Sequence, residues 1–225
     1  MPRTARLAPG GTLFHVLNRG VGRMRLFLKD GDFDAFERII EQTLESRPMR
    51  ILSYCLMSNH WHLVLWPESD GDLGAFMQKL TITHARNWQL NRRRVGYGHL
   101  YQGRYKSFPI ESDEHFYQVV RYVERNPLRA NMVRRAEAWR YSSLWRRISG
   151  TPESRRILSD WPLPRPRSWL QYVNQPQSEA ELKAIRLSVQ RGQPYGGDAW
   201  ARATAARLGL ESTFRARGRP RKQEA

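Results

Sequence analysis

Ile51-Leu52-Ser53-Tyr54-Cys55-Leu56-Met57-Ser58-Asn59-His60-Trp61-His62-Leu63-Val64-Leu65-Trp66 is an apolar run that begins about a quarter of the way along this chain of 225 residues. The run divides at Met57-Ser58-Asn59 into two β-prone segments. Short apolar segments separated by a few turn residues are typical of a β-hairpin. We therefore predict two antiparallel strands here, over residues 49–56 and 60–66.

The second of these strands begins with two histidines. Successive side chains of a strand point to opposite faces, so His60 and His62 share one face and Trp61 faces the other. Two imidazoles on one face can converge on a divalent cation. A pair of half-buried polar residues at a sheet edge has the same pattern, and the histidines alone do not exclude it.

Patterns typical of strands and helices surround this hairpin. In chain order they predict a strand over 12–18, a helix over 32–46, the two hairpin strands, a helix over 72–90, a strand over 105–110 and a helix over 113–124. Asp30 or Asp32 is the expected N-cap of the first helix, and Ser112 that of the last. This order is the split βαβ arrangement, so we expect an α+β, ferredoxin-like antiparallel sheet with helices on one face.

The composition points to a polyanionic partner. Lys and Arg total 38 against 21 Asp and Glu, which gives a formal net charge of +17. Such a surplus attracts nucleic acid and releases its counterions. Eight Trp and nine Tyr could stack on unpaired bases, although protein cores use the same residues.

Other sequence features set the expected location. The single cysteine, Cys55, excludes an intrachain disulfide and a cysteine-based zinc cluster. No apolar stretch approaches the roughly 18 residues needed to span a membrane. The basic start of the chain is not followed by the hydrophobic region of a signal peptide. We therefore expect a soluble, cytoplasmic, nucleoid-associated protein with no membrane partner.

The character of the chain changes after Ser149. We predict a catalytic domain over 1–149 and an extension over 150–225, which consists of a Pro-rich linker, a helical hairpin over 179–208 and a basic, partly disordered tail. Within the tail, Arg217 and Arg219 belong to Arg217-Gly218-Arg219-Pro220, which resembles the core of an AT-hook. A solvated tail that binds phosphate without sequence preference is the alternative, and we favour it.

A tyrosine and an asparagine are the candidate partners of the histidines. Tyr122 and Asn126 are four residues apart, so on a helix they share a face. An amide oxygen can complete a two-histidine site, and Tyr122 would then be within reach of a bound phosphate. Pro127 disfavours the helical conformation at Asn126, which we expect to close the helix. The structural alternative is that Tyr122 packs on the sheet and Asn126 caps the helix.

Taken together, these motifs resemble a known family. Asn59-His60-Trp61-His62, Gln102-Gly103-Arg104-Tyr105-Lys106 and Arg121-Tyr122-Val123-Glu124-Arg125-Asn126-Pro127-Leu128-Arg129-Ala130 are similar to motifs of the REP-associated tyrosine transposases. These proteins carry an IS200-like transposase domain and belong to the HUH superfamily of single-strand DNA nucleases. The resemblance covers about residues 12–145, and the extension after Ser149 is longer than in minimal members.

The resemblance implies a metal-dependent enzyme of transposition and DNA recombination. It implies cleavage and transfer of one DNA strand beside a hairpin, through a 5′-phosphotyrosine on Tyr122. It also implies Mg²⁺ or Mn²⁺ held by His60, His62 and, as the least secure ligand, Asn126. No nucleotide cofactor is needed because the tyrosine linkage conserves the phosphodiester, and the choice between monomer and homodimer stays open.

Basic residues near these motifs are the candidates for binding the DNA backbone. They are Arg19, Arg23, Arg104, Lys106, Arg121 and Arg125, each of which could equally be a solvated surface charge. An inactive, domesticated relative that binds single strands by stacking is the main alternative function. A hydrolase of small phosphoesters is a third, but its substrate would not account for the charge of +17.

Overall fold

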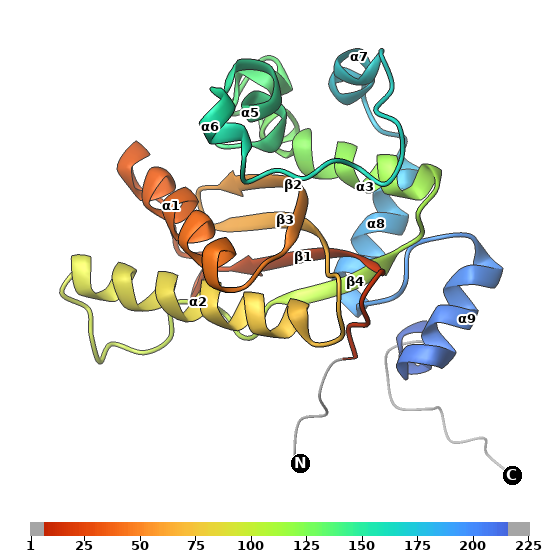
Figure 1. The fold of residues 1–225 in the computed structure, drawn as a ribbon, viewed down its shortest axis with the longest axis horizontal. Helices are drawn as coiled ribbons and strands as arrows, with labels where there is room; N and C mark the ends of the chain where they lie inside the picture. Colours follow the sequence, from red (N-terminus) through yellow and green to blue (C-terminus); the bar gives the residue numbers. More distant parts are fainter. Residues whose placement is uncertain (1–6, 216–225) are drawn as a thin grey trace, which may run out of the picture.

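The centre of the molecule is a four-stranded antiparallel sheet. The structure is a computed structural model that describes residues 7–215. Its strands are β1 (Leu13–Arg19), β2 (Arg50–Met57), β3 (His60–Trp66) and β4 (Lys106–Ile110), in the spatial order β2-β3-β1-β4 (Figure 1). All neighbouring strands pair antiparallel, and β2 and β3 form the predicted hairpin. The expected α+β fold is confirmed.

Two long helices cover one face of the sheet. They are α1 (Asp30–Ser46) and α2 (Asp72–Asn91), and Phe36 and Phe76 lie in one hydrophobic cluster with Trp61. The N-cap of α1 is Lys29 rather than Asp30 or Asp32. Asp32 instead caps the helix from within its first turn, because its carboxylate accepts the backbone N–H of Leu28 at 2.8 Å.

The opposite face carries α3 (Glu114–Glu124) and elements of the extension, so the expectation of helices on one face describes α1 and α2 only. Asp113, not Ser112, is the N-cap of α3, because its carboxylate accepts the N–H of His115 at 2.9 Å. The remaining helices are α4 (Asn126–Arg129), α5 (Ser143–Ser149), α6 (Pro152–Arg155), α7 (Trp169–Asn174), α8 (Glu179–Arg191) and α9 (Asp198–Leu208), with 3₁₀ turns η1 (Val21–Arg23), η2 (Ala136–Ala138) and η3 (Glu211–Phe214).

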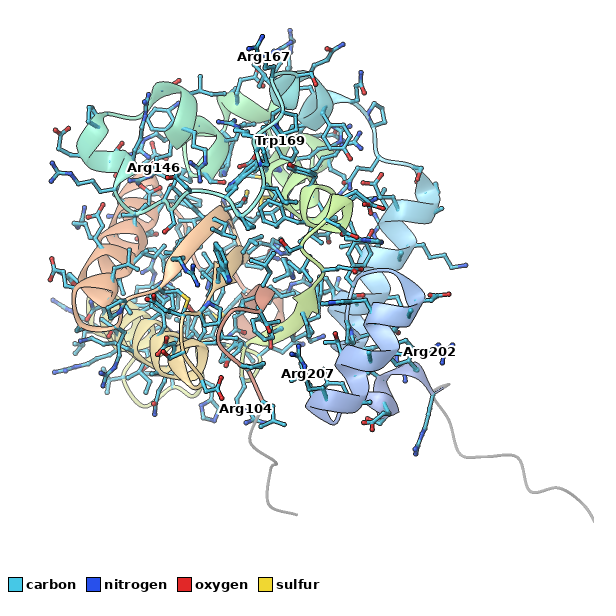
Figure 2. All side chains as sticks on the ribbon, turned by 45° about the vertical axis from the view of Figure 1, so that its right-hand side comes forward. Arg104, Arg146, Arg167, Trp169, Arg202 and Arg207 are labelled. Atoms are coloured by element: carbon cyan, nitrogen blue, oxygen red, sulfur yellow. The ribbon has the colours of Figure 1, made fainter. Side chains whose placement is uncertain are left out.

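The extension packs against this second face. Trp169 and Ile185 are buried in one cluster with Phe116 of α3. Figure 2 shows the side chain of Trp169 directed toward the body of the molecule. The helices α8 and α9 lie at the residues where the two helical patterns predict them, and α8 contacts β4 and α3. Residues of the predicted catalytic domain and of the extension therefore share one hydrophobic cluster. The division of the chain after residue 149 stays a prediction.

A buried carboxylate joins the two segments. Glu124 is fully buried, and it accepts hydrogen bonds from Ser143 Oγ at 2.7 Å and from Trp169 Nε1 at 2.8 Å. Burial raises the pKa of Glu124, while these two hydrogen bonds oppose the shift. Two donors from α5 and α7 thus compensate the removal of this group from water.

Among the described residues, every helix is too short or too polar to cross a bilayer.

Beneath the sheet, a buried histidine makes stability depend on pH. His84 of α2 is 4% exposed and its Nδ1 hydrogen-bonds the Tyr101 hydroxyl, which also accepts from Trp61 Nε1 at 3.2 Å. Burial, with a smaller contribution from the charge of Arg92, lowers the pKa of His84 to about 3. At pH 7 the ring is therefore neutral in the folded protein.

We predict that His84 makes the protein less stable in acid. Its contribution is fully present above pH 6.5, and it is lost as pH falls toward 3, because only the unfolded chain takes up the proton in this window. Below the unfolded-state pKa of about 6.5, the free energy of unfolding should fall by up to about 1.4 kcal/mol per pH unit for this residue, and by less between pH 7 and 6. Urea denaturation at pH 7, 6 and 5 should give His84→Gln a shallower fall than the wild type by this amount, and equal slopes would contradict the prediction.

Candidate active site

The two histidines of β3 lie on the face opposite Trp61, as their alternation predicts. The ring centroids of His60 and His62 are 5.0 Å apart and the rings are nearly perpendicular, at 83°. His60 Nδ1 is 2.6 Å from Asn59 Oδ1, which fixes the orientation of that ring. Among the described residues, no side chain or backbone group hydrogen-bonds Nε2 of either histidine, so both nitrogens are available to a ligand.

A third histidine, on the neighbouring strand, orients His62. His15 Nε2 lies 2.9 Å from His62 Nδ1, and the two ring centroids are 5.0 Å apart. His15 is fully buried, and its ring packs against Phe108 of β4 with the centroids 4.8 Å apart and the planes tilted by 37°. The sequence leaves open whether His15 approaches the site from the neighbouring strand. The structure brings it there, because His15 and Leu17 share a face of β1 and Leu17 pairs directly with His62.

All three histidines are held in the neutral form. Burial lowers the pKa of His60 to about 4, and the charges of Arg19 and Arg129 add to the shift. The pKa of His62 lies well below its ordinary value, through burial and then through His60 and other neighbours. Burial alone lowers that of His15 to about 3. Neutral imidazole is the form that can bind a metal ion.

Tyr122 of α3 points toward the histidines. It is 7% exposed, and its ring makes edge-on contacts with His62 at 5.8 Å and with His15 at 6.3 Å between centroids. These contacts follow from the position of Tyr122 on the face of α3 that packs on the sheet. The histidines and Tyr122, brought together from β3 and α3, form a candidate active site.

Asn126 lies one turn beyond Tyr122, but it begins a helix rather than closing one. The helix α3 ends at Glu124, Arg125 is its C-cap, and Asn126 is the first residue of α4. Proline is well tolerated in the first turn of a helix, so Pro127 starts α4 instead of ending α3. Asn126 is 5% exposed, and its Nδ2 has no hydrogen-bond partner within residues 7–215.

Arg129 connects Asn126 to Tyr122. Its Nη2 donates to Asn126 Oδ1 at 2.9 Å, and its Cζ lies 4.2 Å from the centroid of the Tyr122 ring. Burial lowers the pKa of the Arg129 guanidinium, and the nearby Tyr122 side chain opposes this shift. We did not predict this residue, although Arg129 follows Asn126 by three positions and Tyr122 by seven, which places all three on one helical face.

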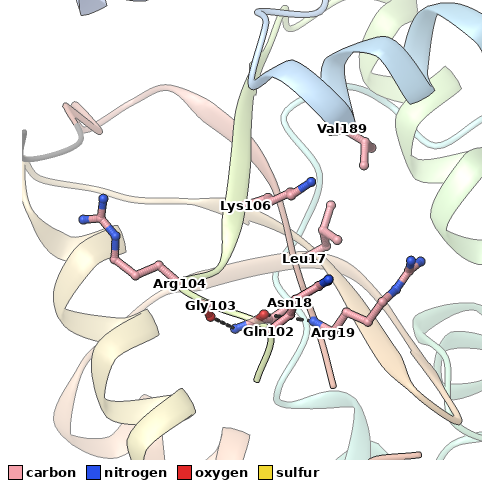
Figure 3. Close-up of a pocket in the computed structure, with 8 residues that line it drawn as sticks. All are labelled: Leu17, Asn18, Arg19, Gln102, Gly103, Arg104, Lys106 and Val189. Atoms are coloured by element: carbon pink, nitrogen blue, oxygen red, sulfur yellow. Dashed lines mark hydrogen bonds between the residues drawn. The ribbon is translucent and has the colours of Figure 1, made fainter. Parts of the chain in front are cut away.

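Three of the predicted DNA-binding residues line one cavity beside the histidines. The cavity has a volume of about 350 Å³, and its basic side chains are Arg19, Arg104 and Lys106. Figure 3 shows Val189 of α8 across the cavity from Leu17. Arg19 pairs with His60 across β1 and β3, so the cavity and the histidines share one face of the sheet.

The other predicted DNA-binding residues are placed differently. Arg121 is buried, donates to the carbonyls of Gln175 and Pro176 at 2.9 Å, and stacks on Tyr172 at 4.0 Å. This placement does not fit the predicted contact with DNA, and Arg121 instead fastens the extension to α3. Arg23 is exposed on η1, and Arg125 is half-buried with Nη1 donating to Asn174. Arg217 and Arg219 lie outside the described residues.

The other tyrosines considered have different surroundings. The Tyr117 hydroxyl donates to the Pro164 carbonyl at 2.6 Å, among the tryptophans of the extension. Tyr101 and Tyr105 pack with the cluster on the opposite face of the sheet. Of these four tyrosines, Tyr122 is the one whose ring contacts His62.

A separate group of possible metal ligands lies between β4 and α3. Ligand atoms of Glu111, Asp113 and His115 all lie within 4.8 Å of one another. Two of these groups have structural partners: Glu111 accepts the N–H of Gly197 at 2.7 Å, and Asp113 caps α3. These contacts account for the arrangement without an ion.

Comparisons with known proteins agree with this geometry. A protein of Haemophilus influenzae named as a REP-associated tyrosine transposase is 24% identical over 134 residues, which are 56% of this chain and 76% of that protein. A solved structure of a REP-associated tyrosine transposase bound to a REP hairpin is similar in fold, with a TM-score of 0.53 at 20% identity. That similarity covers 66% of this chain and 86% of the other.

The family model described as "Transposase IS200 like" matches residues 12–126. This segment spans more than half of the 225 residues and contains the histidine pair, Tyr122 and Asn126. The chain therefore belongs to the IS200-like transposase family.

Proposed function

We propose that this protein is a REP-associated tyrosine transposase, which cleaves and rejoins single-stranded DNA beside a hairpin. The observation that carries the proposal is the contact of the Tyr122 ring with His62, together with the close approach of His60. A tyrosine next to neutral imidazoles that can bind a divalent ion is suited to phosphoryl transfer to the tyrosine. The hairpin DNA in the similar solved structure supports the choice of substrate. The expected cytoplasmic, nucleoid-associated location stays a prediction.

The reaction follows from the position of Tyr122. Its hydroxyl oxygen attacks a backbone phosphorus, the bond from phosphorus to the 3′-oxygen breaks, and a 5′-phosphotyrosine and a free 3′-hydroxyl result. The phenolic proton passes to solvent, and the departing 3′-oxygen takes up one proton, so the step is balanced. Attack on the tyrosine linkage by another 3′-hydroxyl reverses it and transfers the strand.

The residues present fit a divalent ion. His60 and His62 would offer Nε2, because both Nδ1 atoms are engaged by Asn59 and His15. Asn126 would offer Oδ1, a hard oxygen suited to Mg²⁺ or Mn²⁺. When bound, such an ion polarises the phosphate and neutralises the charge that develops on it.

The basic cavity continues this site as a path for the DNA backbone. Arg19, Arg104 and Lys106 line it, and neutralisation of phosphates by such side chains releases counterions. The sheet and α8 line this cavity together, so we expect the extension to contribute to DNA binding.

We predict that Tyr122→Phe abolishes the covalent protein–DNA adduct and strand cleavage together. The substitution removes only the hydroxyl, so folding and hairpin binding should persist. The assay is a denaturing gel of labelled single-stranded hairpin DNA with Mg²⁺ or Mn²⁺. Tyr117→Phe is the matched control and should keep the adduct, because its hydroxyl is engaged by Pro164. An adduct in Tyr122→Phe would refute the assignment, and DNA binding without cleavage in the wild type would favour the inactive binding protein.

We predict that His15→Phe weakens Mn²⁺ binding about 10- to 100-fold, the usual loss when the partner of a ligating histidine is removed. For His62 Nε2 to bind a metal, its Nδ1 must carry the proton and donate it to His15. Phenylalanine preserves the ring packing on Phe108 but cannot accept. Titration of Mn²⁺ by electron paramagnetic resonance measures the change, and His99→Phe, in an exposed loop, should bind as the wild type does. Unchanged binding in His15→Phe would rule out an orienting role.

We predict that Arg104→Gln weakens hairpin binding similarly for all sequences and reduces the slope of log K against log salt by about 1. Arg104 is exposed at the cavity and would bind phosphate. Arg202 of α9 is also exposed and does not line the cavity, so Arg202→Gln is the control. Fluorescence anisotropy measures the two slopes between about 50 and 200 mM salt, a range over which phosphate contacts change the affinity strongly. Equal slopes in both variants would place the DNA elsewhere.

A further inference from the structure

Arg129 is a half-buried cation that lacks an acidic partner among the described residues, and part of its guanidinium is removed from solvent. Among residues 7–215 no carboxylate lies within ion-pair distance of its guanidinium, and its Nη1 is buried without a hydrogen-bond partner. A buried charge without a counterion is costly, and folded proteins usually pair it. The placement of Arg129 therefore indicates that it pairs with an anionic ligand of the protein.

The groups around Arg129 are those of the proposed active site. Nη2 binds Asn126 Oδ1 at 2.9 Å, which is the oxygen that Asn126 would offer to a metal ion. The guanidinium also covers the Tyr122 ring, and its charge acts on both His60 and His62. One cation thus engages the proposed third ligand and the nucleophile, and repels a second cation from the histidines.

A phosphate would change this arrangement. Guanidinium binds phosphate in a charge-assisted and often bidentate manner, which is stronger than a bond to a neutral amide oxygen. The charge of Arg186 of α8 repels that of Arg129. An anion bound beside Arg129 would therefore be attracted by both cations. Phosphate binding to Arg129 would release Asn126 Oδ1 and partly cancel the charge that opposes the metal.

We propose that Arg129 couples metal binding to DNA binding: without DNA it competes with the metal for Asn126 Oδ1, and the phosphate of bound DNA draws it away. This inference rests on the proposed function, because it takes His60, His62 and Asn126 as the metal site. Metal and DNA then bind cooperatively, and by linkage each raises the affinity of the other by the same factor. Arg129 is also a catalytic residue in this scheme, since it contacts the substrate phosphate.

The experiment measures Mn²⁺ affinity by electron paramagnetic resonance, with and without a single-stranded hairpin oligonucleotide. All proteins carry Tyr122→Phe, which prevents cleavage and leaves the bond from Arg129 to Asn126 in place. The test variant is Arg129→Leu, which removes the donors and the charge but keeps apolar volume. Arg186→Leu is the matched control, because it removes one nearby charge that does not contact Asn126. His62→Ala identifies binding at the proposed site, and circular dichroism confirms that each protein is folded.

Without DNA, Arg129→Leu should bind Mn²⁺ about tenfold more tightly than the parent, and Arg186→Leu should change it by much less. DNA should tighten Mn²⁺ binding in the parent about tenfold, and this gain should be largely lost in Arg129→Leu. If Arg129→Leu does not fold, Arg129→Gln should show the same directions with smaller changes, since glutamine removes the charge but keeps a donor.

Three results overturn the proposal, and they can be told apart. Mn²⁺ binding that depends on His62 but is no tighter in Arg129→Leu refutes the competition and leaves the proposed function intact. Mn²⁺ binding that is the same in His62→Ala, with and without DNA, refutes the metal site itself and the coupling with it. Tightening by Arg129→Leu that Arg186→Leu matches would also refute the competition, because general charge would then explain it.

Discussion

The register between β1 and β3 is the constraint on which the site depends. It places Leu17 opposite His62 and Arg19 opposite His60. Directly opposite residues share a face, so the same register puts Arg19 beside the histidines and brings His15 within hydrogen-bond distance of His62. A slip of one residue would move Arg19 to the other face. Packing of Trp61 under the sheet opposes such a slip, so the apolar core fixes the polar site above it.

One face of the sheet packs against the hydrophobic core, and the other carries the candidate active site. Under the sheet, α1 and α2 close a wholly packed cluster around Trp61. On the other face, α3 and the extension cover one part and leave open the cavity beside His60. Glu124 and Arg121 fix this division, because both are buried and both bind groups of the extension. The extension is thus part of the wall around the site, which the sequence pattern alone does not indicate.

What the sequence predicts and what it misses have separate physical origins. Alternation along a strand is local, so the opposite facing of His60 and Trp61 follows directly from their adjacency. The spacing of Tyr122 and Asn126 likewise depends only on helical geometry. By contrast, Arg121 matches a surface charge in the sequence, and only the long-range approach of α7 and α8 buries it. Arg129 was not predicted, because its contact with Tyr122 crosses the break at Arg125 between α3 and α4. The sequence left the approach of His15 open, because its partner His62 lies on another strand.

The charge of the molecule takes two forms that act at different stages of binding. We propose that exposed cations such as Arg104 and Lys106 attract DNA at long range, where salt screens their charge. The guanidinium of Arg129 is half-buried against Asn126 and Tyr122, where salt screens its charge less, and no carboxylate of the described residues pairs with it. The cost of this burial is part of the free energy of the DNA-free protein, and a phosphate at the site would offset it. Binding energy that appears only when the phosphate is in place favours assembly of the complete site on DNA rather than before it.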